Sequence, residues 1–286
     1  MTETNIVRGA LCSILAAFLF ALMGAGVKYS SQFVSSETVV FLRNAFGLLF
    51  LLPWLHNAGL NTLKTQRFGA HLIRTATGLT AMYCFFYAIA HLRLGEAVLF
   101  NFSSPLFIAV IAMLWLREPT SKYVIGAIVV GFIGVLLILK PGISPLSVAS
   151  FAGIAAGIFV AIAMVSIRNL SSTEPTVRIV FYFSFLSTII SSIPMIWSWE
   201  MPSLKVWGVM LGAGFIATKA QLLMTYAYRL APAAKIGAFA YMNVIFAASF
   251  GWLFWSETFD SVSIIGAFLI CVSGLMTTIK KKAEVS

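Results

Sequence analysis

Ten apolar stretches, separated by short polar connectors, fill most of the 286-residue chain. Each is about long enough for a helix that crosses the hydrocarbon core of a bilayer, which takes roughly 20 residues. Their apolarity is continuous rather than alternating, and backbone amides in lipid must be satisfied within the segment, so helices are expected and a β-barrel is not. The pattern predicts an all-α membrane protein with ten transmembrane helices. The stretches cover residues 9–27, 38–56, 72–92, 97–116, 123–139, 148–167, 177–197, 206–228, 233–254 and 262–279.

Composition agrees with a membrane protein. Hydrophobic residues make up 60% of the chain and charged residues only 10%, against roughly 25% charged residues in a soluble domain. The first stretch follows Arg8 and so resembles a signal peptide. It is longer than the apolar core of a cleaved signal and further stretches follow it, so we interpret it as a retained helix.

The basic residues sort by membrane side. The net charge of +10 would suggest nucleic acid as a partner of a soluble protein, but here it follows the positive-inside rule, so we expect no nucleic acid. Thirteen basic residues fall on one side of the predicted membrane and four on the other, which predicts a cell inner or plasma membrane protein with both termini in the cytoplasm. The four are Lys28, Arg93, Lys140 and Lys205; the thirteen are Arg8, Lys64, Arg67, Arg74, Arg117, Lys122, Arg168, Arg178, Arg229, Lys235, Lys280, Lys281 and Lys282.

The two halves of the chain echo each other. A shift of 139 residues places Tyr87 on Tyr226, and Glu118 of a predicted cytoplasmic connector on Glu257 of a predicted external one. The ordered run of matches indicates duplication of a five-helix unit. Because five is odd, the second unit must cross the membrane in the opposite sense. Residues 1–142 and 143–286 are therefore predicted as two inverted five-helix repeats, an architecture common among secondary transporters.

The motifs of these halves resemble the EamA-type branch of the drug/metabolite transporter superfamily. Each half carries an apolar helix, a short turn with a glutamate, and a helix with spaced glycines. The second half departs from the pattern where Val244 aligns with Pro105. The resemblance covers nearly the whole chain, and it implies ten helices around a central cavity lined mainly by helices 1–4 and 6–9. The matching residues are Pro105, Glu118, Gly126, Gly131 and Gly134 in the first half, and Phe246, Glu257, Gly266 and Gly274 in the second.

Ionisable residues inside the apolar stretches are the first candidates for a substrate site. Lys219 lies near the middle of the eighth stretch, where a charge facing lipid would cost at least ~2.5 kcal/mol, so we expect it to face a cavity. Lys219, with Thr218 and Gln221, is predicted to bind an anionic or carbonyl group of a substrate, and a structural hydrogen bond is the alternative. Arg43 is read as a gate residue or a helix anchor, and Arg74 as an anchor.

Two further charges stand at equivalent positions of the repeat. The same shift relates Glu96 to Lys235, near opposite membrane faces. They are candidates for a gate, or for charges that only mark helix ends. Glu96 is also the carboxylate best placed to carry a coupling proton.

Polar and aromatic side chains in the middle of helices complete the candidate substrate site. Asn101 and Ser104 in the fourth stretch, and Tyr241 and Asn243 in the ninth, suit a solute path, and hydrogen bonds between helices are the alternative. Tyrosine rings are also able to stack on a flat substrate. The tyrosines chosen for this role are Tyr83, Tyr87 and Tyr241.

Common catalytic motifs are missing from the sequence. It contains no phosphate-binding loop of the G-x-x-x-x-G-K type, no H-E-x-x-H and no G-x-S-x-G. Cys12, Cys84 and Cys271 are too widely spaced for a metal motif. We therefore expect neither a cofactor nor a metal, and no enzymatic activity.

The predicted function is secondary transport of a small organic metabolite by alternating access. A vitamin such as riboflavin, or an amino-acid-type solute, would suit an aromatic cavity with a polar anchor. One alternative is a broad-specificity efflux pump; a membrane-embedded enzyme acting on lipid is another. The predicted partners are the solute and the bilayer. The sequence leaves the oligomeric state, the coupling ion and the direction of transport open.

Overall fold

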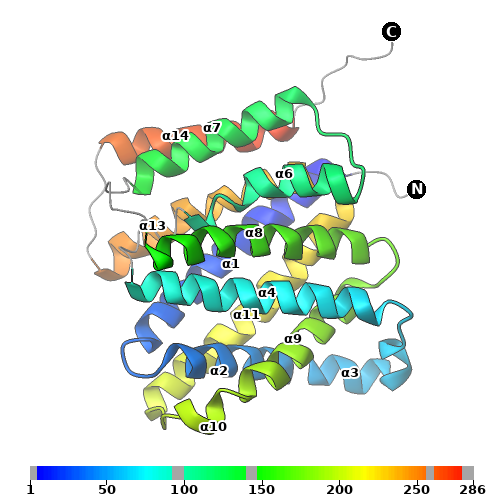
Figure 1. Cartoon of the computed structure of the whole chain (residues 1–286), viewed down its shortest axis with the longest axis vertical. Helices are drawn as coiled ribbons and strands as arrows, with labels where there is room; N and C mark the ends of the chain where they lie inside the picture. Colours follow the sequence, from blue (N-terminus) through cyan, green and yellow to red (C-terminus); the bar gives the residue numbers. More distant parts are fainter. Residues whose placement is uncertain (1–4, 92–99, 140–146, 256–260, 279–286) are drawn as a thin grey trace.

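The computed structural model describes residues 5–91, 100–139, 147–255 and 261–278 of the chain. Those residues form helices and no strands, as expected (Figure 1). Glu96 and Glu257 lie outside the described residues. The helices are α1 (Ile6–Ser30), α2 (Ser36–Leu49), α3 (Leu52–Ala58), η1 (Leu60–Leu63), α4 (Phe68–His91), α6 (Ser104–Trp115), α7 (Lys122–Leu139), α8 (Val148–Leu170), α9 (Thr176–Ser192), α10 (Met195–Ser198), α11 (Leu204–Leu230), α12 (Ala233–Gly237), η2 (Ala238–Tyr241), α13 (Met242–Trp255) and α14 (Ser261–Thr278).

In the described residues, each of the ten predicted stretches overlaps helical structure, but four of them are interrupted. In the fourth stretch a turn at residues 102–103 precedes α6, which begins just before Pro105. The second stretch divides into α2 and α3 just before Pro53, and the seventh divides into α9 and α10 at Pro194. Proline lacks the N–H that a continuous helix needs, and it fits the first turn of a new one. The ninth stretch consists of α12, η2 and α13. Sequence periodicity alone did not reveal these breaks.

The described part of the chain contains five helical segments that are long and apolar enough to cross a membrane. Four shorter apolar helices accompany them, within α6, α7, α9 and α14. The chain is therefore a multi-pass membrane protein. The five long segments are Ile6–Ser30, Ser36–Ala58, Val148–Leu170, Leu204–Leu230 and Ala233–Phe254.

Equivalent helices of the two halves run in opposite directions. Gly9, at the start of α1, lies against Ala231, just beyond the end of α11, so these two helices are antiparallel. Arg168, near the end of α8, donates a hydrogen bond to the carbonyl of Arg229 near the end of α11. α1 therefore begins at the end of the bundle where its counterpart α8 finishes. The first helix of each half also packs on a helix of the other half: α1 packs on α11, and α8 packs on α4.

Helices α7 and α14 pack against each other at one edge of the bundle (Figure 1). A Cβ at Gly134 would lie 2.6 Å from the carbonyl oxygen of Gly266, so this close approach requires glycine. Ser273 adds a hydrogen bond to the carbonyl of Ala127 at 2.6 Å. The peripheral position of the last helix of each half agrees with the family resemblance.

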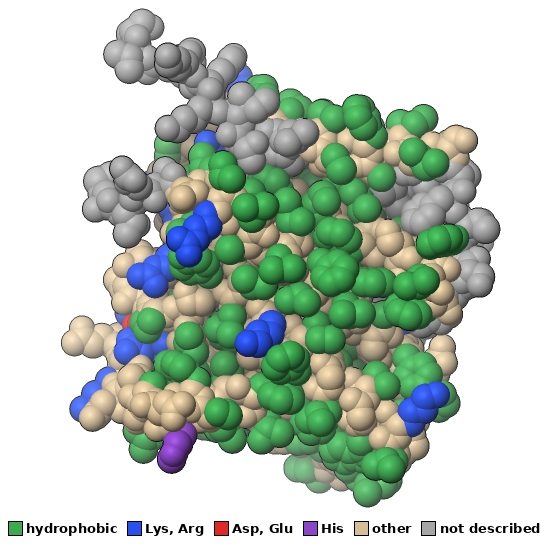
Figure 2. Space-filling model, turned by 180° about the vertical axis from the view of Figure 1, so that it is seen from behind, with side chains coloured by type: hydrophobic (Ala, Val, Ile, Leu, Met, Phe, Trp, Pro, Cys, Tyr) green, Lys and Arg blue, Asp and Glu red, His purple; other side chains and the backbone are tan. Residues whose placement is uncertain are grey.

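The outer surface is hydrophobic along the helices and basic at one end. Figure 2 shows hydrophobic side chains over most of one face, with Lys and Arg side chains gathered along one edge. Large exposed apolar side chains, such as Leu15, Phe151 and Leu253, belong to this surface. We call the end that carries the basic residues the basic end. Its described residues include Arg8, Lys64, Arg67, Arg117, Lys122, Arg168, Arg178 and Arg229.

Candidate functional site

Two arginines are buried inside the helix bundle and share one aromatic ring. Arg43 on α2 is 7% exposed and Arg74 on α4 is 3% exposed. Their guanidinium carbons lie 5.8 Å and 4.0 Å from the ring centroid of Phe183, a buried residue of α9. A cation over the face of an aromatic ring is stabilised by the ring quadrupole, most strongly where water is excluded. Arg43 and Arg74 come from the first half and Phe183 from the second.

Neutral amides provide the hydrogen bonds of these arginines. Arg43 Nη1 donates to Asn44 Oδ1 at 2.7 Å, and Arg74 Nη2 donates to Gln221 Oε1 at 3.2 Å. Two buried donors beside them, Arg74 Nε and Asn44 Nδ2, have no hydrogen-bond partner. Because buried polar groups are normally paired, this surplus of donors indicates a place for an acceptor that is not part of the protein.

A narrow crevice lies beside Arg43, between helices of both halves. Its non-atom space, open solvent included, is about 170 Å³, below the roughly 300–1,000 Å³ of a typical ligand pocket. In this conformation the crevice is too narrow to admit a water molecule. Thr218 Oγ1 is 3.0 Å from the carbonyl oxygens of both Gly47 and Gly214, and this hydroxyl joins α2 to α11. The residues that line the crevice are Arg43, Asn44, Gly47, Ser184, Ala217, Thr218 and Gln221.

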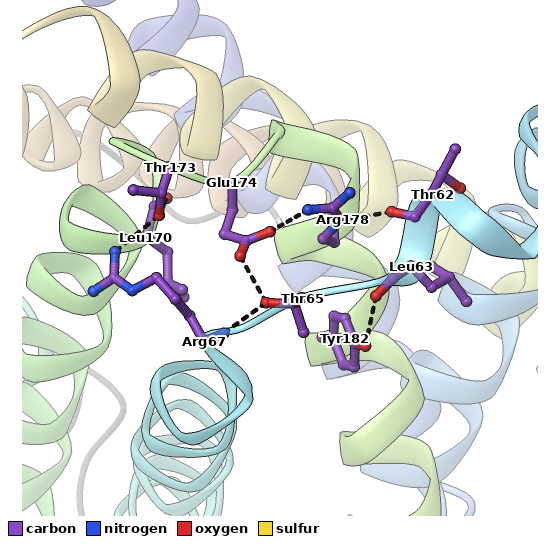
Figure 3. A network of polar contacts seen from close by, with 9 residues as sticks. All are labelled: Thr62, Leu63, Thr65, Arg67, Leu170, Thr173, Glu174, Arg178 and Tyr182. Atoms are coloured by element: carbon purple, nitrogen blue, oxygen red, sulfur yellow. Dashed lines mark hydrogen bonds and ion pairs between the residues drawn. The ribbon is translucent and has the colours of Figure 1, made fainter.

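A polar network at the basic end connects the two halves (Figure 3). Glu174, in the turn before α9, accepts a 2.6 Å hydrogen bond from Thr65 and another from Arg178. Arg178 also donates to the carbonyl of Thr62, and Tyr182 donates to that of Leu63. Burial raises the pKa of Glu174, but the hydrogen bonds from Thr65 and Arg178 outweigh it and hold this pKa below its ordinary value. The carboxylate therefore stays ionised and the network intact at neutral pH.

Glu118 makes a second connection at the same end. Its Oε1 pairs with Arg168 Nε at 2.7 Å, and its Oε2 accepts the N–H of Ala233 at the start of α12. Arg168 also donates to the carbonyl of Tyr228 at 3.0 Å. The carboxylate of Glu118 thus holds two helix ends of the second half directly, and Arg168 connects the end of α11 to them.

Among the described residues, fewer polar contacts join the halves at the opposite end. The N–H of Ser35 donates to Glu200 Oε2 at 3.2 Å, and the Ser35 hydroxyl donates to the carbonyl of Ser198 at 3.3 Å. The Ser35–Glu200 contact is exposed to solvent. Within the described ranges, the basic end is the more firmly closed of the two.

Comparison with known proteins places the chain in a family. The EamA-like transporter family matches it twice, over residues 7–140 and 147–279. The chain belongs to the EamA-like transporter family. It is also similar along nearly its whole length to curated transporters, and it is not an enzyme.

Three relatives illustrate the range of this family. The pseudopaline exporter CntI of Pseudomonas aeruginosa (strain UCBPP-PA14) is 35% identical over 277 residues, covering 96% of this chain and 97% of the relative. The riboflavin transporter of Vibrio cholerae is 29% identical, covering 93% and 91%. The S-adenosylmethionine uptake transporter of Rickettsia bellii is 24% identical, covering 94% of each. A solved structure titled "Crystal structure of protein" shares the fold, with a TM-score of 0.81, 14% identity and 97% coverage of both chains.

The structure does not place Lys219 of this transporter in a cavity. Its side chain is exposed on the outer face of α11, with Nζ 5.5 Å from the ring centroid of the exposed Phe215. Successive residues of a helix turn by about 100°, so Thr218 and Gln221 share a face and Lys219 points nearly opposite to Gln221. The expectation that all three face one cavity was wrong, and the helical period was enough to show it.

The structure also corrects the interpretation of Arg74, which is more deeply buried than expected. It was read as an interfacial anchor, but it lies inside the bundle, since its side chain extends along α4 toward Gly78, away from the end at which α4 begins. Arg43 lines the crevice together with Thr218 and Gln221. Sequence reasoning missed Asn44 and Phe183. In the structure α2 packs against α9, so Arg43, in the middle of α2, lies beside residues of α9. The sequence does not show this helix contact.

The other polar candidates lie away from the crevice. Tyr241 is fully buried among side chains of α7 and α14, with its Cδ2 2.5 Å from a Cβ built at Gly131. This ring fills the notch that Gly131 leaves, so the structure gives it a packing role instead of a place on the solute path. Asn243 Nδ2 donates to the carbonyl of Ala17 at 2.8 Å, which is the helix-to-helix bond held as the alternative. Ser104 is buried and Asn101 is partly buried, both outside the crevice lining.

The remaining candidates are also separate from the crevice. Tyr83 is partly buried, and its hydroxyl has no hydrogen-bond partner. Tyr87 is 44% exposed on α4, which does not suit an interior stacking role. Lys235 is partly exposed on the short helix α12 at the basic end, two residues beyond the N–H bound by Glu118. Its predicted counterpart Glu96 lies outside the described residues.

Proposed function

We propose that this chain is a secondary transporter that moves a small organic metabolite across the cytoplasmic membrane by alternating access. Residues 1–142 and 143–286 form the two halves, with ten spans and both termini in the cytoplasm. The observation that carries the proposal is the buried cluster in which Arg43 and Arg74 of one half meet Phe183 of the other. Charged side chains inside a membrane bundle mark substrate or ion paths by default.

The antiparallel relation of equivalent helices supports this mechanism. Two halves related by an in-plane pseudo-twofold axis can exchange inward-open and outward-open shapes around a fixed central site. The crevice stands at that site, because α2 and α9 are equivalent helices and contact each other. Its small volume, and the networks of Glu174 and Glu118, fit a conformation closed toward the basic end. Opening toward the cytoplasm then requires these contacts to separate.

The identity of the solute rests on the same cluster. An amino-acid-type metabolite leads, because its carboxylate suits two buried arginines, and one relative is named an S-adenosylmethionine uptake transporter. A vitamin such as riboflavin is uncharged, and the name of another relative supports it instead. Export is the second candidate, because the relative that is 35% identical is named an exporter. A narrow crevice with fixed charges favours a selective site over a broad-specificity pump, whose substrates share few polar groups.

Uptake into proteoliposomes tests the proposal. Purified protein is reconstituted and offered riboflavin, S-adenosylmethionine and amino acids, with and without an imposed pH gradient. Selective, saturable accumulation that Arg43→Gln abolishes is the expected result. Indiscriminate movement of dyes would favour the efflux pump, and no movement of any solute in either direction would contradict transport.

A further inference from the structure

We propose that the transported solute carries a carboxylate, which binds between the guanidinium groups of Arg43 and Arg74. This inference rests on the proposed function and names the chemical class of its substrate. It follows from the charge and the unpaired donors of the cluster, and it assigns Lys219 no part in recognition.

The charge balance of the cluster is the first argument. An arginine stays protonated in proteins, so Arg43 and Arg74 place two positive charges against a single ring. Of the described glutamates, Glu118 and Glu174 are paired at the basic end and Glu200 lies at the opposite end. Glu37, in the first turn of α2, forms no ion pair with either arginine. Buried charges are normally paired, so an anionic group of the solute supplies the missing partner.

The donor set is the second argument. Arg74 Nε and Asn44 Nδ2 are buried and unpaired, and both belong to side chains that are at least nine-tenths buried. The acceptors that the arginines now use, Asn44 Oδ1 and Gln221 Oε1, are neutral. A carboxylate accepts several hydrogen bonds through its two oxygens, and the planar fork of a guanidinium matches it in two parallel bonds.

Gly78 positions Arg74 for this role. It lies one turn beyond Arg74 on α4, and a Cβ there would collide with Arg74 Nη1 and lie 3.1 Å from Phe183 Cε2. The guanidinium occupies the space that a side chain at residue 78 would take. Gly78→Ala therefore displaces the charge without removing it, which separates the position of Arg74 from its contribution to net charge.

Ligand binding to the purified protein in nanodiscs provides the test. The probes are benzoate, succinate, citrate and N-acetylglutamate, each paired with its uncharged amide. Phenyl phosphate and riboflavin serve as a phosphate ester and a neutral solute. S-adenosylmethionine is included as an amino-acid-type solute that carries a carboxylate. Thermal unfolding detects binding, and titration calorimetry measures the affinity. Arg43→Gln and Arg74→Gln are compared with Lys219→Gln, which removes one positive charge from the outer face of the same bundle.

The expected result is that at least one acid stabilises the wild type while its amide does not. Loss of one partner of a buried charge pair should weaken that binding by about 30-fold or more in Arg43→Gln and Arg74→Gln. Lys219→Gln should bind as the wild type does. Arg74→Lys should recover part of the affinity, and Gly78→Ala should lose affinity while its unfolding temperature stays close to that of the wild type.

Other results overturn the inference. Binding of riboflavin without any of the acids would do so, as would preference for phenyl phosphate, affinity equal to that of the wild type in Arg43→Gln and Arg74→Gln, or no binding by any acid. Counterflow in proteoliposomes separates this failure from failure of the proposed function. Movement of riboflavin alone would keep transport and remove the carboxylate site. Arginine-dependent binding of an acid without movement of any solute would keep the site and remove transport.

Discussion

The guanidinium carbon of Arg74 lies 4.0 Å from the ring centroid of Phe183, and the two residues belong to opposite halves of the transporter. This contact joins α4 of the first half to α9 of the second. In the alternating-access cycle proposed above, one half moves relative to the other across this boundary. The proposed substrate site is then connected to the relative position of the halves, and a solute that binds Arg74 would compete with this contact or reinforce it.

Replacing Phe183 tests this connection. Phe183→Leu removes the ring face but keeps the apolar volume, so the desolvated cation–π stabilisation of about 2 kcal/mol is lost. We expect the apparent affinity for the transported solute to fall by up to about 30-fold, since 1.4 kcal/mol corresponds to a factor of ten. Phe185→Leu is the matched control, because Phe185 is exposed on the same helix and stacks on Phe181. Equal transport by both variants would remove Phe183 from the site.

The carboxylate of Glu118 should control closure at the basic end. Glu118→Gln weakens the pair with Arg168 and the hydrogen bond from Ala233, and hydrogen bonds to charged groups contribute about 1.5–3 kcal/mol. In the variant, the population of the conformation that is open at the basic end should therefore rise at least about fivefold. Spin labels at residues 122 and 229 report the change as a longer distance distribution.

Glu200→Gln is the control for that experiment, because Glu200 joins the halves at the opposite end. It should leave the distances between residues 122 and 229 unchanged or shorter. If both glutamine variants lengthen them equally, the contacts of Glu118 stabilise the fold in general and are not a gate.

Acid should weaken the network around Glu174. The pKa of Glu174 in the folded protein is lower than its ordinary value, so its stabilising contribution is present above the unfolded pKa, roughly 4.3, and is lost as pH falls through the folded pKa. Thermal unfolding of the wild type should thus lose part of its stability below about pH 4. Glu174→Gln should lower the unfolding temperature at pH 7 and remove that part of the acid dependence. An identical acid profile in the variant would exclude this carboxylate as its source.

Topology can be tested with two exposed lysines at opposite ends of the bundle. Lys122 starts α7 at the basic end, and Lys205 lies in the first turn of α11, with its Nζ 5.0 Å from the ring centroid of Tyr29. In a chain without its three native cysteines, Lys205→Cys should react with a membrane-impermeant maleimide in intact cells. Lys122→Cys should react only after permeabilisation, because the positive-inside rule places the basic end in the cytoplasm. Labelling of both in intact cells would contradict the inverted topology.

Part of the candidate site was accessible from the sequence. Arg43 was predicted as a gate residue or a helix anchor, and Thr218 and Gln221 as partners of Lys219 in substrate binding. The structure places Arg43, Thr218 and Gln221 at the crevice. Lys219 was chosen by the rule that polar groups inside apolar stretches are costly unless they line an interior, and it lies outside, where its ammonium contacts the ring of Phe215. The rule identifies residues that need a polar or aromatic partner, and it leaves open which side of the helix provides one.

The sequence by itself determined the class of the protein, its ten apolar stretches and the duplication of a five-helix unit, because these depend on local hydrophobicity and on spacing along the chain. The tertiary structure alone decided which polar side chains meet. Phe183 lies more than a hundred positions along the chain from both Arg43 and Arg74, and it meets them only because α9 of the second half packs against α2 and α4 of the first. Because successive residues of a helix are rotated by about 100°, one neighbour points into the crevice and the next toward the outer surface. Which of them faces the crevice depends on how the helix packs against the other helices.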